Sequence, residues 1–398
     1  MVDGFAAGPQ ALGYFYQARY ALFLLLDSDE DSELSIEVLD DVIFGTDGSI
    51  YELLQFKHHI NSQASLSDSS PDLWKTIGTW SMYLKQSKIS FNTLLTLITN
   101  ASAPNQSIAS LLRADKNRNL DIASHRLLQI ATASQNANLR PSFEAFLALS
   151  DHEREHLLDS IRILDQSKDI SDVSSLIKKK INLTVRREYL DSLYERLEGW
   201  WLAKVIQHLV AKSKEPITWY EVHDKICEIA DQLRADSLPI DFLDAKPPIE
   251  PDPRTDNRRF VLQLRLIAVH NKRIEKAILD YYRAFEQRSR WAREELLIGN
   301  ELDTYEKSLM DEWERHFWAC QEKMETDDAS EGTLRGCGRE VYDWMEFSAD
   351  VRIRPRVTEP YVVRGSYHIL ANDDPPRVGW HPKFLDRLEE LLASLSER

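Results

Sequence analysis

The chain has 398 residues, and its 65 Asp and Glu outnumber its 49 Lys and Arg, which gives a formal net charge of −16. This length is enough for about two or three domains, and 43% hydrophobic with 29% charged residues is typical of a globular protein. The longest apolar run, residues 21–26, is too short to span a bilayer, and the first ten residues lack the basic and apolar regions of a secretory signal. We therefore expect a cytoplasmic protein with no membrane partner, whose acidic charge disfavours extensive phosphate contacts.

The first sixty residues predict a helix followed by a β-hairpin. Residues 11–26 are apolar and aromatic almost throughout, which predicts a buried helix. Residues 33–45 alternate apolar and polar side chains, which predicts one strand. A turn signal at residues 46–49 and a second alternating run at residues 50–60 predict the strand that returns beside it.

A further helix and strand are predicted before residue 100, and helices dominate after it. Pro71 follows a Ser/Asp cluster and suits the first turn of a helix, and residues 90–100 form a β-branched, apolar strand. Thr218 and Glu221 have the spacing of a capping box. The expected helices of the middle region cover residues 121–134, 151–164, 171–181, 185–212 and 218–234.

The last third of the chain predicts a Pro-rich linker and a small mixed domain. Residues 258–324 are helical in pattern, residues 350–357 and 361–369 read as strands, and residues 382–396 as a closing amphipathic helix. The expected class is therefore α+β. We expect a nuclease-type α/β core at residues 1–105 and a helical middle region at residues 106–240. A Pro-rich linker is expected at residues 241–257, and a mixed α/β docking domain at residues 258–398.

The predicted hairpin brings together residue types that suit phosphodiester hydrolysis. Residues two apart share a face of a strand, so Glu37 shares one with Asp41, and Gln55 shares one with Lys57. A carboxylate and an amide oxygen suit a hard divalent cation such as Mg²⁺ or Mn²⁺, and a nearby Lys stabilises negative charge on phosphoryl oxygens. Alternation turns Asp40 to the other face, but a bulge would exchange it with Asp41. The competing interpretation is a solvent-facing strand pattern without function.

Four segments of this region resemble a known family: GYFYQ (13–17), IEVLDDV (36–42), LLQFKHH (53–59) and SDSSPDLWKTIGTW (67–80). Together they resemble the PD-(D/E)XK-type double-stranded DNA endonuclease domain of bacterial anti-phage effectors, which is shared with cyclic-oligonucleotide signalling systems. The resemblance implies that Asp41 is the metal-binding acid, that Gln55 is a metal ligand in place of the usual acid, and that Lys57 is the catalytic lysine. It further implies supporting roles for Glu37 and Gln17.

Residues beside these motifs are candidate DNA contacts. His58 follows the catalytic lysine candidate, and a polar strand end or a phosphate contact is favoured there over a catalytic base. Lys75 is expected to contact DNA, whereas the neighbouring Trp74 suits a buried anchor between helix and sheet. Residues 1–100 hold 13 Asp and Glu against 5 Lys and Arg, so such contacts would be few.

The C-terminal part carries a resemblance of its own, in AFEQRSRW (284–291), LDTYEKSLMDEWERHFW (302–318), VYDWMEF (341–347) and YVVRGSYHILANDDPPRVGWHP (361–382). These stretches resemble a C-terminal domain of the ABC three-component defence systems, which include Lamassu. The resemblance implies a dock for an ATPase of the structural-maintenance-of-chromosomes (SMC) type and for a small middle subunit. Trp and Arg, abundant here at Trp313, Trp344, Trp380 and Arg354, are enriched at interface hot spots, although the Trp residues suit a small core equally well.

The combined prediction is a bacterial anti-phage effector. Its N-terminal domain would cut double-stranded DNA and would be held inactive by its partners. Release and homo-oligomerisation would activate it, as in defence by abortive infection. The chief alternative is a non-catalytic adaptor that binds DNA or a partner on a degenerate nuclease fold. A cyclic-nucleotide sensor is a third alternative, but residues 101–240 show neither a Gly-rich phosphate loop nor a basic cluster along the sequence.

Overall fold

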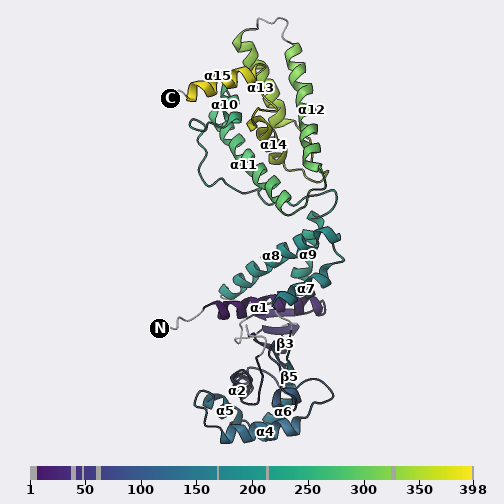
Figure 1. Ribbon diagram of the computed structural model, residues 1–398. Coiled ribbons are helices and arrows are strands. Elements are labelled where there is room, and N and C mark those ends of the chain that lie inside the picture. Colours follow the sequence, from purple (N-terminus) through teal and green to yellow (C-terminus); the bar gives the residue numbers. More distant parts are fainter. Residues whose placement is uncertain are drawn as a thin grey trace. The chain divides into compact units, whose positions relative to one another are not determined.

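The computed structural model describes residues 7–36, 42–46, 49–59, 64–167, 170–211, 215–323 and 329–396. The chain is 58% helical with one six-stranded mixed sheet, which confirms the α+β class. It divides into an N-terminal unit, Met1–Ile229, and a C-terminal unit, Ala230–Arg398 (Figure 1). Across the described ranges, no helix combines the length and the apolar character that a membrane span requires.

The sheet belongs to the N-terminal unit, and its strands run in the order β5-β4-β3-β2-β1-β6. Strands β1, β2 and β3 are antiparallel neighbours, β3, β4 and β5 are parallel, and β6 pairs antiparallel with β1. Their bounds are β1 (Glu33–Ile36), β2 (Val42–Thr46), β3 (Ser49–Lys57), β4 (Leu94–Thr99), β5 (Ile161–Leu164) and β6 (Ile217–Thr218).

The single strand expected over residues 33–45 is wrong, because two antiparallel strands lie there. Leu34 pairs with Phe44, and Ile36 pairs with Val42, so the chain reverses direction between β1 and β2. Alternation with a period of two is the same in one long strand and in two strands joined by a reversal. The pattern therefore predicted strand structure correctly and missed the reversal.

Helices cover both faces of the sheet. On one face, Tyr16 and Tyr20 of α1 contact the ring of Phe56. On the other face, Trp74 of α2 packs in a core that includes Leu53 of β3. The helices of this unit are α1 (Ala7–Asp27), α2 (Pro71–Lys85), α3 (Ile108–Leu111), α4 (Leu120–Ala133), α5 (Arg140–Leu147), α6 (Asp151–Ser160), α7 (Ile170–Ile181), α8 (Leu190–Val210) and α9 (Trp219–Gln232).

The expected boundary at residue 105 does not separate two domains. Strands β5 and β6 come from the predicted helical middle region and form both edges of the sheet. The helix expected over residues 151–164 ends at Ser160, and the next four residues pair with β4. Pairing with a strand some sixty residues earlier is not visible in a local pattern.

The capping box at the start of α9 is confirmed, since Thr218 Oγ1 accepts from the Glu221 amide at 3.2 Å and the Glu221 carboxylate accepts from the Thr218 amide at 3.1 Å.

The described part of the C-terminal unit is helical, which corrects the expected mixed α/β docking domain. Residues 361–369 lie in a helix that Pro360 begins, and residues 350–357 form turns. All residues of 361–371 except Arg364 and Ile369 are buried in this helix, and its Val and Tyr residues are types that favour strands in isolation. The six helices are α10 (Arg259–Leu266), α11 (Asn271–Arg293), α12 (Glu301–Glu322), α13 (Glu331–Phe347), α14 (Pro360–Asn372) and α15 (Phe384–Ser396).

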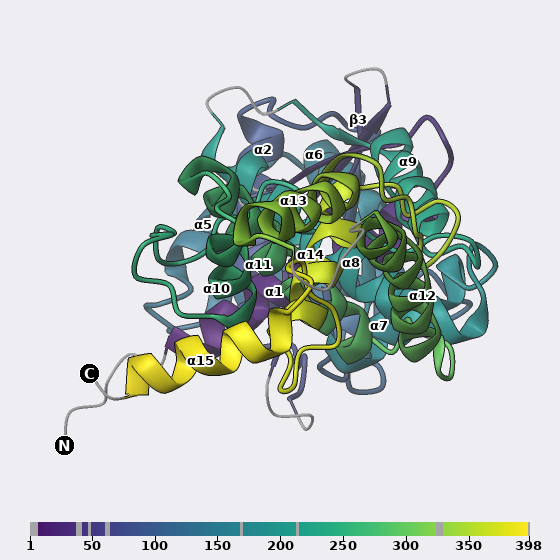
Figure 2. The same cartoon turned by 90° about the horizontal axis from the view of Figure 1, so that it is seen from above.

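Helix α14 is central to this unit and contacts α10, α11, α12 and α13 (Figures 1 and 2). A Cβ on Gly365 would lie 2.1 Å from the carbonyl oxygen of Asp280 on α11, so only glycine allows this approach.

The Pro-rich segment expected as a linker packs on the same unit. Ala245 O accepts from Arg283 Nε at 2.9 Å, and Pro253 O accepts from Arg265 Nε at 2.8 Å.

Candidate functional site

A cavity of about 300 Å³ lies between strand β3 and helices α2 and α5. Gln55 and Lys57 of β3 line it together with Lys75 of α2, which is the shared face that alternation predicted. Gln55 is 8% exposed, Lys57 is half-buried and Lys75 is exposed. The remaining lining residues are Gly78, Thr79, Met82, Pro141 and Ser142.

The close packing of α2 on α5 shapes this cavity. A Cβ on Gly78 would lie 2.6 Å from the Cα of Ser142, so a glycine is needed where the two helices meet. The Trp74 ring packs edge-on against Phe143 with centroids 4.6 Å apart, and its Nε1 donates to the Asp68 carbonyl at 2.8 Å. Trp74 is therefore the buried anchor that the sequence predicted.

Two predicted site residues do not line this cavity. His58 packs against the Tyr16 ring with centroids 4.6 Å apart, on the side of the sheet that α1 covers. Gln17 belongs to α1, whose tyrosines contact Phe56 on that same side. Alternation explains the result for His58, because it is one residue beyond Lys57 and turns to the opposite face.

The end of β3 is held by a group of contacts that sequence reasoning missed. The His59 amide donates to Asn100 Oδ1 at 2.8 Å, and Asn100 Nδ2 donates to the His59 carbonyl at 2.6 Å. His59 Nε2 lies 2.8 Å from Asp72 Oδ2, in the first turn of α2. These contacts connect the strand that carries Lys57 to β4 and α2. In the sequence, Asp72 reads only as an acidic residue near a helix N-terminus.

The predicted acids Glu37, Asp40 and Asp41 lie outside the described residues. Asp41 directly precedes Val42, whose partner Leu54 directly precedes Gln55. Within the described ranges, no three His, Cys, Asp or Glu side chains are grouped as metal ligands. The described cavity lining has one amide oxygen suited to a hard cation and two ammonium groups that repel one, so a metal there needs carboxylates from outside this lining.

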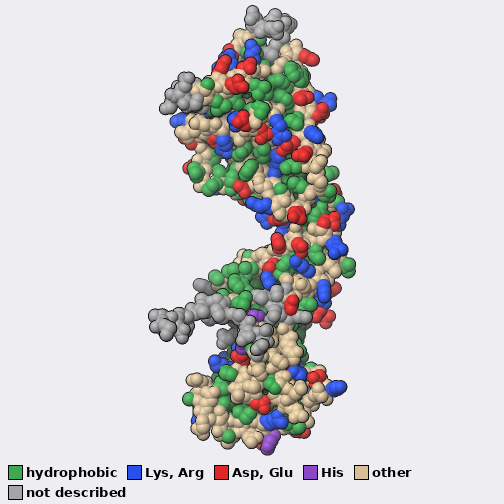
Figure 3. All heavy atoms as spheres, in the orientation of Figure 1, with side chains coloured by type: hydrophobic (Ala, Val, Ile, Leu, Met, Phe, Trp, Pro, Cys, Tyr) green, Lys and Arg blue, Asp and Glu red, His purple; other side chains and the backbone are tan. Residues whose placement is uncertain are grey.

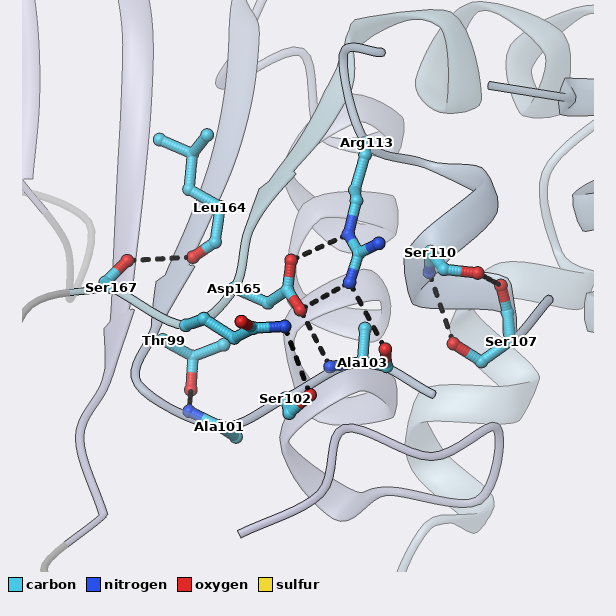
Figure 4. A network of polar contacts seen from close by, with 11 residues as sticks. Thr99, Ala101, Ser102, Ala103, Ser107, Ser110, Arg113, Leu164, Asp165 and Ser167 are labelled. Carbon is cyan, nitrogen blue, oxygen red and sulfur yellow. Dashed lines mark hydrogen bonds and ion pairs between the residues drawn. The ribbon is translucent and has the colours of Figure 1, made fainter. Parts of the chain in front are cut away.

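A second polar network fixes the loops that follow β4 and β5 (Figure 4). The Asp165 carboxylate accepts from Arg113 Nε at 2.7 Å and Nη2 at 2.6 Å, and from the Ala103 amide at 2.8 Å. Burial alone would raise the pKa of Asp165, but the hydrogen bonds from Arg113 and Ala103 outweigh it and hold this pKa below its usual value. The carboxylate therefore stays charged and ties the two loops together.

The C-terminal unit buries most of the residues that had suggested docking. Trp380 and Trp313 are core residues, 0% and 7% exposed, and Arg354 is 4% exposed and paired with Glu301 at 2.7 Å. Trp318, at 57% exposed, and Phe347, at 70%, remain on the surface. Figure 3 shows Lys and Arg interspersed with Asp and Glu on the visible side of this unit, so the net negative charge forms no single acidic face there.

Comparison with known proteins finds a family match in the C-terminal region. Residues 260–388 match the family model of C-terminal domain 7 of the ABC-three component (ABC-3C) systems, so this part of the chain is similar to domains of that type. No curated protein matches the chain.

Among solved structures, the chain is similar to Cap4 SAVED/CARF-domain containing receptors. The Acinetobacter baumannii receptor with the cyclic trinucleotide 3′3′3′-cAAA has 14% identity and a TM-score of 0.33, with 67% of this chain and 59% of that chain covered. The Moraxella osloensis receptor has the same identity and TM-score, with 64% and 60% covered. The chain thus spans about six-tenths of the length of these structures, and the likeness is too low to define a shared fold.

Proposed function

Starting from the ABC-3C type of the C-terminal domain, we propose that the chain is the effector subunit of a bacterial anti-phage system, and that its N-terminal unit is a metal-dependent double-stranded DNA endonuclease. The observation that carries the proposal is the cavity in which Gln55 and Lys57 of one β3 face meet Lys75 of α2. An amide oxygen and two ammonium groups in one recess suit a phosphodiester better than an apolar substrate.

The reaction would be hydrolysis of the DNA backbone. A water oxygen forms a bond to phosphorus and one bridging P–O bond breaks, which leaves a phosphate monoester and a hydroxyl group. Lys57 and Lys75 would stabilise the negative charge that develops on the phosphoryl oxygens. Gln55 and Asp41 would hold Mg²⁺ or Mn²⁺, and a bound divalent cation supplies Lewis acidity and a more acidic water.

Control by partners is part of this proposal, and the charge and the C-terminal domain support it. A chain with a net charge of −16 is repelled by DNA, so a single copy binds it weakly. We propose that an SMC-type ATPase and a small middle subunit dock on residues 260–388 and hold the nuclease inactive in the cytoplasm. Exposed Trp318 and Phe347 are aromatic anchors of the kind that interfaces use. Release and homo-oligomerisation would then add avidity for DNA.

The test is plasmid cutting by the full chain, alone and with its partner subunits, in Mg²⁺ and in Mn²⁺. Lys57→Ala is compared with Lys85→Ala, an exposed lysine on α2 that pairs with Glu153 outside the cavity. We expect Lys57→Ala to lower the rate by about 10²–10³-fold, as loss of one transition-state donor does, and Lys85→Ala to leave it unchanged. Equal rates for both variants, or no cutting by the unmodified chain under any of these conditions, would refute the nuclease.

A non-catalytic adaptor that binds DNA or a partner is the second candidate. Two features favour it: Gln55 stands where an acid is usual, and the described lining of the cavity includes no carboxylate. Titration of Mn²⁺ by electron paramagnetic resonance separates the two candidates. A nuclease site should bind Mn²⁺ and lose this binding in Asp41→Ala, whereas an adaptor should show equal, weak binding in both proteins.

A further inference from the structure

A second, larger cavity of about 700 Å³ lies in the N-terminal unit, around the turn between α3 and α4. We call it the basic cavity, because four cationic side chains line it and no carboxylate does among the described lining residues. The cations are Arg113, Lys116, Arg118 and Arg126, and Asn105 and Asn117 are among the neutral polar residues beside them. The sequence showed no basic cluster here because the four cations are spread over residues 113–126 and interrupted by Asp115 and Asp121.

The guanidinium group of Arg118 is fixed in place by hydrogen bonds to backbone carbonyl oxygens. Its Nη1 donates to Leu112 O at 2.8 Å and to Ile161 O at 2.9 Å, and its Nη2 donates to the carbonyls of Leu158 and Asp159, each at 3.0 Å. The described residues provide no carboxylate within ion-pair distance of it. Burial and the nearby charge of Arg162 lower the pKa of Arg118, yet an arginine stays protonated at neutral pH.

The other three cations differ in how far carboxylates neutralise them. Asp165 pairs with Arg113, and Asp68 lies 3.9 Å from Arg126, whose Nη1 also donates to the Gln106 carbonyl. Lys116 is exposed and has no ion-pair partner in the described part of the chain. Lys116 and Arg118 are therefore the two lining cations that no carboxylate pairs with in the described residues, although the charge of Asp159 acts on Arg118 from farther away.

The lining also indicates which part of an anionic ligand fits. The described lining contains Asn, Gln, Ser, Arg, Lys and aliphatic residues but no aromatic ring on which a base could stack. Phosphates are recognised by Arg, Lys and amide groups without base contacts. Arg113 is bonded to Asp165, which directly follows β5 (Figure 4), and Arg118 is bonded to the carbonyl of Ile161, which begins β5, so the basic cavity is anchored to both ends of this edge strand.

We propose that the basic cavity binds backbone phosphates of double-stranded DNA and holds a flank of the duplex outside the cavity of Gln55 and Lys57. The choice of DNA as the ligand rests on the proposed function. The cavity would contribute affinity without sequence readout, since phosphate contacts position a protein on DNA but do not specify bases.

The test measures DNA binding without cutting. The full chain carrying Lys57→Ala is titrated with a labelled duplex in EDTA, by fluorescence anisotropy, between 50 and 200 mM salt. Lys116→Ala is added to this background and compared with Lys179→Ala, which removes the same charge from an exposed position on α7. Thermal melts establish that both variants are folded.

We expect Lys116→Ala to reduce the slope of log affinity against log salt by about 0.9, the value for one lost phosphate contact. The affinity ratio of parent to variant should then be about 3.5-fold larger at 50 mM than at 200 mM salt. Lys179→Ala should leave the slope unchanged. Equal slopes for the two variants would overturn the proposal.

Two further experiments complete the test. One distinguishes duplex DNA from free phosphate as the ligand, and the other distinguishes failure of this proposal from failure of the proposed nuclease activity. If inorganic phosphate or a mononucleotide binds in a Lys116-dependent way while duplex binding is unaffected, DNA is the wrong ligand and the proposal falls. If duplex binding depends on Lys116 although the unmodified chain never cuts plasmid, the cavity stands and the nuclease fails. If the chain cuts plasmid and Lys116→Ala binds the duplex like its parent, the nuclease stands and the cavity fails.

Discussion

Gly78 offers the sharpest test of how the candidate cavity is built, because a single methyl group there meets backbone. In Gly78→Ala the new Cβ would lie 2.6 Å from Ser142 Cα, whereas carbon atoms in contact normally stay about 3.5–4.0 Å apart. Helices α2 and α5 must therefore separate by roughly 1 Å. Overpacking of this kind costs about 1–3 kcal/mol.

The same substitution also has a favourable part, which a control can isolate. Replacing glycine by alanine inside a helix stabilises it by about 1 kcal/mol. Gly199 of α8 is an exposed helical glycine whose added Cβ would meet nothing within 4 Å. Gly199→Ala should therefore stabilise the N-terminal unit by about 1 kcal/mol, and Gly78→Ala should be less stable than Gly199→Ala by the overpacking cost of about 1–3 kcal/mol.

The assay is equilibrium urea unfolding of the full chain, followed by tryptophan fluorescence. Because the chain has two units, the transition of the N-terminal unit is identified as the one that a C-terminal substitution leaves unchanged. Ser142→Gly removes the Cβ but not the Cα, so it should rescue Gly78→Ala only in part. Equal free energies of unfolding for Gly78→Ala and Gly199→Ala, within about 0.5 kcal/mol, would refute the reasoning.

Two further predictions concern buried ion pairs. The pKa of Asp165 is lowered in the folded chain, so its charge stabilises the fold above the pKa of an unfolded carboxyl, about 3.9, and this contribution is lost as the pH falls through the folded pKa. The difference in unfolding free energy between the unmodified chain and Asp165→Asn should therefore be constant from pH 7 to about 5 and shrink below about 4; a difference that grows on acidification would contradict it. Arg354→Met would leave the half-buried Glu301 carboxylate and the carbonyls of Ser237 and Leu296 without the Arg354 donors, and should cost about 3 kcal/mol in urea unfolding, the low end for a broken buried pair. Arg352→Met, which breaks an exposed pair with Asp350, should cost under about 1 kcal/mol, and similar losses for both would show that burial of the Arg354 pair is unimportant.

The sequence predicted what local pattern determines. Strand alternation placed Gln55 and Lys57 on one face, and the structure has both in one cavity. Pro71 began its helix as expected, and Trp74 became its buried anchor. These results depend on side-chain direction and on residues within one or two turns, which the sequence contains directly.

Features that depend on distant partners were not predictable in the same way. The reversal between β1 and β2, the pairing of β5 with β4, and the helical state of residues 361–369 are each decided by neighbours far along the chain. The Val and Tyr residues of α14 favour a strand in isolation, but packing on α11 at Gly365 requires a helix. The basic cavity likewise exists only once α3, α4 and the start of β5 are assembled.

The edge strand β6 has a consequence for the timing of synthesis. Glu33 of β1 pairs with Thr218, so the first edge of the sheet stays open until most of the N-terminal unit has been translated. At ordinary elongation rates the ribosome needs roughly 10–40 s to make the intervening residues. During this interval the nascent chain exposes unpaired strand backbone, which favours association with other chains. A fragment that stops near residue 105 would keep this exposed edge permanently, so we expect it to aggregate, whereas the unit Met1–Ile229 contains all six strands of the sheet.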